Sequence, residues 1–204
     1  MPQRKVTIER VATFSDGVFA VIITIMVLDL KLPEHPTFAA LLPLWPTALS
    51  YQFIAIVWLN HHHLLRFTDY ATPRLIWINF VHLFMVSLVP FSTAWVARTR
   101  LAAVPVFVYA GVFVLVELAY LQFEHYALSR AALEEVSHQT RRLARIRSLI
   151  AFGLFLTGML GSLKFPLCGF GLVCCAVLLY LRPEPPGIRG DSADEALLKD
   201  EAVS

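Results

Sequence analysis

Charged residues are scarce in this sequence of 204 amino acids. Asp, Glu, Lys and Arg make up 16% of the chain and hydrophobic residues make up 57%, whereas about a quarter of the residues in a soluble domain are charged. A Gly-rich phosphate loop, a nucleophile elbow and paired catalytic carboxylates are also lacking, which argues against an enzyme. We therefore expect a membrane protein with no cofactor and no nucleic-acid partner.

Cysteine is also rare. The three cysteines, Cys168, Cys174 and Cys175, fall in the last apolar stretch, without a CxxC pair or a nearby histidine. This pattern favours small packing residues over a redox or metal site. The same stretch contains a CGFG run, which lacks the TVGYG pattern of a potassium filter and is more typical of close helix packing.

Long apolar runs dominate what remains. They predict six membrane-spanning helices in an all-α domain of residues 1–181, followed by a disordered tail over 182–204. The expected spans are about 11–30, 47–67, 74–96, 105–126, 148–163 and 165–181. Pro90 should kink the third span, and the last two are short enough to form a tight hairpin at Lys164. The connection 33–46 has room for a short surface helix, and 130–147 is polar but compatible with a helix.

The distribution of basic residues predicts the orientation. With six spans both termini lie on one side, and thirteen of the 17 Lys and Arg residues then fall in segments on that side. Because cytoplasmic segments carry the excess of Lys and Arg, both termini should be cytoplasmic. No cleavable signal peptide is expected, since the first apolar run is too long and contains an aspartate. The chain should be an integral protein of a bacterial plasma membrane, surrounded by lipid.

The first span contains polar residues that a membrane helix does not carry without cause. An ionised Asp16 inside a membrane costs roughly 2.5–3.5 kcal/mol, so it needs a partner or a function. At about 100° per residue one stripe forms along the helix, and Ser15 and Asp16 point away from it. The stripe contains Arg10, Phe14, Gly17, Val21, Thr24, Ile25 and Leu28. From periodicity alone, it faces either lipid or a neighbouring helix.

The pattern Arg10-x-x-x-Phe14-Ser15-Asp16 at the head of a first span resembles the signature of the transmembrane protein 175 family, the potassium channels of lysosomes and many bacteria. The likeness continues through GVFAVIITIMVLDLKLP. It extends to Trp58, Asn60, His61 and His62 on the second span, and to Asn79 and the LVPF run of residues 88–91 on the third.

The resemblance implies a homotetramer in which the first helices line a pore that favours K⁺. Val21, Ile25 and Leu28 would form hydrophobic rings, and Thr24 would form a hydroxyl ring near which the ion passes. Aliphatic rings gate by dewetting, and hydroxyl oxygens replace part of an ion's water shell. Val21 is smaller than the Ile or Leu expected there, which leaves open which ring is narrowest.

The opposite face of the first helix should anchor it. We expect Ser15 and Asp16 to join a polar network with residues of the second and third spans. The candidates are Trp58, Asn60, His61, His62, Asn79 and His82. In the family, the matching motif residues are regarded as structurally essential.

Other polar residues leave alternatives open. His61, His62 and His63 are consecutive, which is the wrong spacing for one metal ion on a helix, but they offer titration near neutral pH. Glu117 lies mid-membrane, where it belongs either to an ion path or to a hydrogen bond within the bundle; Glu124 and His125 should cap or be solvated.

Two other functions compete with a channel. The first is a proton- or cation-coupled transporter with Asp16, Glu117 and the histidines as a relay. The internal repeat and broken helices typical of transporters are not evident, which favours the channel. The second is a non-conducting membrane scaffold, in which Thr24 would be dispensable.

Overall fold

We describe the chain from a computed structural model, over residues 7–31, 36–68, 71–129 and 138–180. All regular elements in these ranges are helices, which agrees with the predicted all-α fold. They are α1 (Ile8–Leu28), η1 (Phe38–Leu44), α2 (Trp45–Leu65), α3 (Pro73–Ser87), α4 (Val89–Arg98), α5 (Ala103–Leu128), α6 (His138–Ser162) and α7 (Pro166–Tyr180). The expected tail of residues 182–204 lies outside the described residues.

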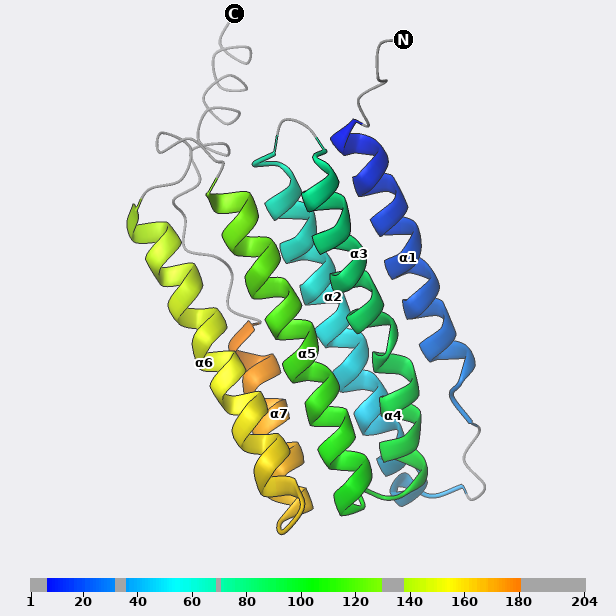
Figure 1. Ribbon diagram of the computed structural model, residues 1–204. Coiled ribbons are helices and arrows are strands. Elements are labelled where there is room, and N and C mark those ends of the chain that lie inside the picture. The colour runs from blue at the N-terminus through cyan, green and yellow to red at the C-terminus, as the bar shows by residue number, and fades with distance from the viewer. Residues whose placement is uncertain (1–6, 32–35, 69–70, 130–137, 181–204) are drawn as a thin grey trace, which may run out of the picture.

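The helices run side by side in one bundle (Figure 1). α1 forms one edge and α6 forms the opposite edge, with α5 between them. At one end of the bundle lie the start of α1, the end of α2 and the start of α3. The other end holds the end of α1, the end of α4 and the connection from α6 to α7.

Within the described ranges, four helical segments are long and apolar enough to cross a membrane. They are Ile8–Leu28, Phe38–Leu65, Pro73–Arg98 and Ala103–Leu128, and Pro166–Leu179 is a shorter apolar helix. They overlap the first four expected spans and the last one, and the second begins earlier than expected because η1 runs directly into α2. η1 occupies the expected place of the short surface helix, with Phe38 and Leu42 exposed.

The third segment bends where the sequence predicts. α3 ends at Ser87 and α4 begins at Val89, with Leu88 between them and Pro90 in the first turn of α4. Proline has no backbone N–H, and its ring clashes with the carbonyl four residues earlier. The helix therefore breaks just before Pro90.

The core lies around α5. Phe113 stacks on Phe53 of α2 at 4.2 Å between ring centroids and meets Phe155 of α6 edge-on at 5.4 Å. Tyr109 is fully buried beside them, and its hydroxyl lies 2.8 Å from that of Ser50. The Thr93 hydroxyl in turn donates to Ser50 at 2.8 Å. These two hydrogen bonds satisfy three buried hydroxyl groups and link α2, α4 and α5.

α6 corrects two sequence predictions. The polar segment 130–147 and the span 148–163 were expected to be separate, but His138–Ser162 is one continuous helix. The composition of the helix changes from polar to apolar near Ser148, and a change in composition does not mark the end of a helix. Glu124 is buried rather than solvated, because it accepts a hydrogen bond from the Ser148 hydroxyl at 3.0 Å.

The predicted hairpin of α6 and α7 is present, and glycine allows its close packing. A Cβ added to Gly169 would lie 2.6 Å from the Ser162 Cβ and 2.7 Å from the Gly158 carbonyl oxygen. Only a residue without a side chain fits there. This observation bears out the packing role expected of the CGFG run.

Candidate functional site: the first helix and its anchor

α1 has one covered face and one open face. Its covered face contains Val11, Ser15, Phe19, Ile22 and Met26, which are all buried against the rest of the bundle. Because α1 stands at the edge of the bundle, its opposite face is largely exposed (Figure 1).

The covered face is held by buried hydrogen bonds among three helices. The amide of Asn79 on α3 donates to the Ser15 hydroxyl at 3.0 Å. The Asn79 Oδ1 lies 2.6 Å from Nε2 of His61 on α2. All three side chains are at most 1% exposed. Ser15 also donates to the Val11 carbonyl at 2.8 Å, so its hydroxyl has two partners. One asparagine therefore links α1 to α2, and both links avoid the cost of unpaired polar groups.

Asp16 has a separate partner. The indole Nε1 of Trp58 on α2 donates to its carboxylate at 2.7 Å. This charge-assisted bond lies on the side of α1 that faces α2. The aspartate therefore contacts α2 from one flank of the covered face, while Ser15 contacts α3 from within that face.

The remaining network candidates lie nearby without joining by direct hydrogen bonds. Asn60 is buried and His62 is exposed, and neither side chain bonds to another described residue. The His62 ring lies 5.8 Å from that of Trp58. His82 is fully buried, with its ring parallel to that of His61 at 5.6 Å, and neither of its ring nitrogens has a hydrogen-bond partner among the described residues.

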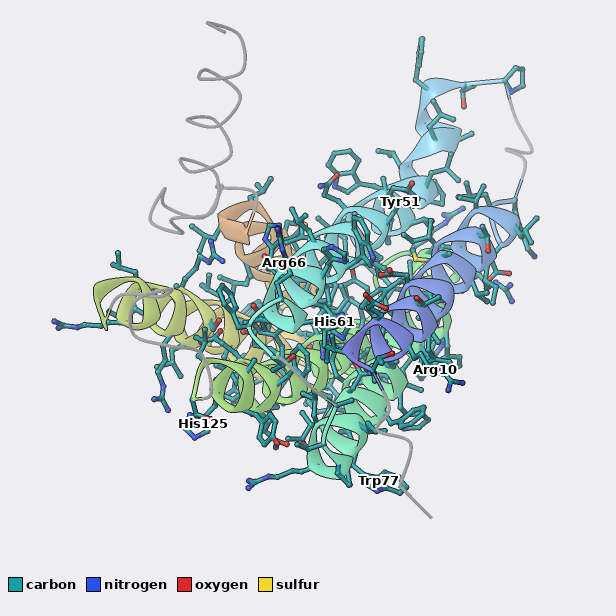
Figure 2. The ribbon with its side chains drawn as sticks, turned by 90° about the horizontal axis from the view of Figure 1, so that it is seen from above. Arg10, Tyr51, His61, Arg66, Trp77 and His125 are labelled. Carbon is teal, nitrogen blue, oxygen red and sulfur yellow. The ribbon has the colours of Figure 1, made fainter. Side chains whose placement is uncertain are left out.

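The open face of α1 carries the predicted stripe. Its members Arg10, Phe14, Gly17, Val21, Thr24, Ile25 and Leu28 are all exposed. Val21 is 56% exposed, Ile25 45% and Leu28 83%, and they succeed one another along the helix. Figure 2, which looks down the bundle, shows Arg10 beside the first turns of α1 and His61 further inside. The described part of one chain leaves this stripe largely open.

Thr24 is suited to present oxygen to a cation. Its hydroxyl donates to the Val21 carbonyl at 2.8 Å. Because the hydrogen is directed at the helix backbone, the lone pairs of the oxygen remain for another partner. The side chain is exposed between Val21 and Leu28. It is thus a hydroxyl acceptor within an otherwise aliphatic surface.

The sequence reasoning missed two contacts of α1. Phe14 meets Phe80 of α3 edge-on, with ring centroids 5.4 Å apart, so an aromatic pair supports the N-terminal end of the stripe. At the other end, Asp29 forms an ion pair with Arg98 of α4, with Nη2 and Oδ1 3.8 Å apart. No spacing rule connects residues this far apart in the chain, although the lone acid directly after the stripe was a visible signal.

The other acid that the sequence singled out lies away from this helix. Glu117 is buried in α5, and Glu124 bonds to α6. The described residues contain no group of three His, Cys, Asp or Glu side chains placed to hold a metal ion. The side-chain hydrogen bonds from α1 to other described helices are therefore made with α2 and α3.

These features define the class of protein. Four long apolar segments, an apolar surface and buried polar links between helices belong to an all-helical integral membrane protein.

Comparison with known proteins defines the family. Residues 10–90 match the family described as the endosomal/lysosomal potassium channel TMEM175. A potassium channel of Chryseobacterium sp. (strain P1-3) is 32% identical over 183 residues, which cover 86% of this chain and 93% of the relative. A potassium channel of Chamaesiphon minutus is 30% identical over 182 residues, which cover 83% and 90%.

A solved structure agrees with the sequence matches. The crystal structure of a lysosomal potassium-selective channel TMEM175 homolog from Chamaesiphon minutus superposes with a TM-score of 0.72 at 26% identity, over 85% of this chain and 95% of that one. The chain belongs to the TMEM175 family. Because this is a family of channels, the prediction that the protein is not an enzyme is confirmed.

Proposed function

We propose that four copies of this chain form a potassium channel, with the open stripe of α1 from each copy lining the pore. The observation that carries the proposal is that stripe. It spans the helix from Arg10 to Leu28, and the described part of the same chain leaves it largely exposed. A single stripe cannot enclose a pore, so several chains must surround an axis, as closed rotational symmetry allows.

The chemistry of the stripe fits passive conduction of monovalent cations. Val21, Ile25 and Leu28 would form aliphatic rings that gate by dewetting. Thr24 would contribute an oxygen from each chain, and its backbone hydrogen bond leaves that oxygen as an acceptor. The names of the relatives and of the solved structure support K⁺ as the favoured ion.

The anchor explains how such a pore keeps its shape. The Ser15–Asn79–His61 links lie within the covered face, and the Asp16–Trp58 bond lies at its flank. Together they fix the rotation of α1 about its axis, which decides the side chains that face the pore. In this proposal Ser15 and Asp16 are positioning residues and do not touch the ion.

The proposed membrane arrangement has six crossings. α3 and α4 form one bent crossing, and α6 and α7 form a hairpin that completes the set. The excess of Lys and Arg on one side supports cytoplasmic termini in a bacterial plasma membrane. Thr24 and Leu28 then lie in the outer half of the pore, and Arg10 lies at its cytoplasmic entrance.

Thiol accessibility tests the pore lining. In a variant without native cysteines, reconstituted in bilayers, Thr24→Cys should let a charged, water-soluble thiol reagent reduce the potassium current. Thr157→Cys is the matched control, because Thr157 is also exposed and donates to a backbone carbonyl, at 2.7 Å, but lies on α6. Equal sensitivity of the two variants, or insensitivity of Thr24→Cys in a conducting channel, would contradict the proposal.

A further inference from the structure

The outer end of α1 carries a charge pair that the signature motif does not include. Asp29 follows Leu28 directly and is the C-cap of the helix. Its carboxylate lies 3.8 Å from the guanidinium of Arg98, in the last turn of α4. The two side chains are 49% and 59% exposed, so the pair stands in the open at the end of the bundle.

Asp29 occupies a place that disfavours a negative charge. The C-terminus of a helix has a partial negative charge, and cations stabilise it. α1 has no basic residue in its last turn, so Arg98 supplies the compensating charge from α4. An exposed pair of this kind contributes little to stability. The fold alone therefore gives small reason for an acid at this position.

The position has a consequence for conduction. Leu28, the outermost member of the stripe, is 83% exposed, and Asp29 is one residue further out. Among the described residues, Asp29 is the acidic side chain at this end, where Lys31, Arg98 and Arg100 are also exposed. Acidic rings raise the local cation concentration at channel mouths, whereas arginines lower it.

We propose that the Asp29–Arg98 pair sets the electrostatic potential of the outer mouth and thereby the rate at which cations enter the pore. The positive charge of Arg98 partly cancels the attraction of the four Asp29 carboxylates for cations. The inference rests on the proposed function, since it requires the stripe of α1 to line the pore.

Single-channel conductance at low ionic strength tests this inference. At about 10 mM salt the Debye length is about 30 Å, and at 1 M it is about 3 Å. Arg98→Gln should raise the potassium conductance roughly twofold or more at low salt, and the difference should vanish at 1 M. Asp29→Asn should lower the conductance under the same conditions.

Two further variants separate local charge from other effects. Arg100→Gln removes the same charge from the next turn, away from the pair, and should have a smaller effect. The double variant Asp29→Asn with Arg98→Gln restores the net charge of the pair to zero and should return the conductance toward the wild-type value. A purely structural role of the ion pair would make the double variant resemble the single ones.

The outcomes distinguish this inference from the proposed function. A conducting wild type whose low-salt conductance is the same in Arg98→Gln, or changes equally in Arg100→Gln, would overturn the role of the pair and leave the pore assignment intact. A wild-type tetramer with no potassium current would overturn the proposed function itself.

Discussion

Among the residues that hold α1 through the Ser15–Asn79–His61 links, Asn79 should be the one whose replacement lowers the free energy of unfolding most. Asn79→Ala removes the acceptor 2.6 Å from His61 Nε2 and the donor 3.0 Å from Ser15. His61 Nδ1 already has no partner among the described residues, so the buried ring would lose its hydrogen bond altogether. Ser15 would keep its bond to the Val11 carbonyl. The loss should therefore fall mainly on His61.

The magnitude follows from the unpaired groups. A buried polar group left without a partner costs about 1–3 kcal/mol, and hydrogen bonds between membrane helices measured by double-mutant cycles average about 0.6 kcal/mol. We expect Asn79→Ala to lower the free energy of unfolding by about 1–3 kcal/mol. Ser15→Ala should cost less, because Asn79 would keep its contact with His61.

The assay is unfolding of the purified protein in mixed micelles, followed by circular dichroism as the denaturing detergent increases. Asn79→Leu separates hydrogen bonding from volume, because leucine fills the site but bonds to neither neighbour. It should be destabilised as well. If Asn79→Leu were as stable as the wild type, or if Ser15→Ala cost more than Asn79→Ala, the assignment of Asn79 as the central link would be refuted.

Three further predictions concern other contacts. Asp16→Ala should abolish assembly or current, because it removes the acceptor of the Trp58 indole hydrogen bond at 2.7 Å. Asp16→Asn keeps an acceptor and should retain part of the current. Wild-type current from a well-folded Asp16→Ala variant would refute this prediction. Gly169→Ala should destabilise the protein by about 1–3 kcal/mol, because the added Cβ would lie 2.7 Å from a carbonyl oxygen of α6. Gly171→Ala is the control: an added Cβ there would meet nothing within 4 Å, so this variant should be near neutral in the same unfolding assay. Arg100→Gly should raise the melting temperature, because Arg100 has a left-handed backbone with φ 49°. This conformation costs a residue other than glycine about 1–2 kcal/mol. An unchanged or lower melting temperature would argue against backbone strain at this position.

The sequence was sufficient for most of the fold because the membrane restricts the choice of structure. Long apolar runs must be helices there, so α1, α2 and α5 followed from length, and the break at Leu88 followed from Pro90. The continuous α6 was missed because its first turns are polar, and hydropathy detects the apolar part of a helix rather than its end.

The candidate site was predictable where residues share one helix. The stripe of α1 follows from the helical period, and the separation of Ser15 from it follows from the same geometry. Which residue of α2 or α3 meets a given residue of α1 depends on the register between helices, and a single sequence does not contain that register. Thus Trp58 and Asn79 were predicted as candidate partners, but the structure was needed to pair Trp58 with Asp16 and Asn79 with Ser15. It was also needed to pair Arg98 with Asp29.

The central claim is that the exposed stripe of α1 lines a potassium-selective pore. Reversal potentials in reconstituted bilayers, under opposed potassium and sodium gradients, test it most directly for the wild type, Thr24→Ala and the control Thr157→Ala. We expect a current that favours potassium, a lower selectivity in Thr24→Ala and an unchanged selectivity in Thr157→Ala. Verified tetramers with no current, a current that follows only a proton gradient, or a Thr24→Ala channel with wild-type selectivity would contradict it.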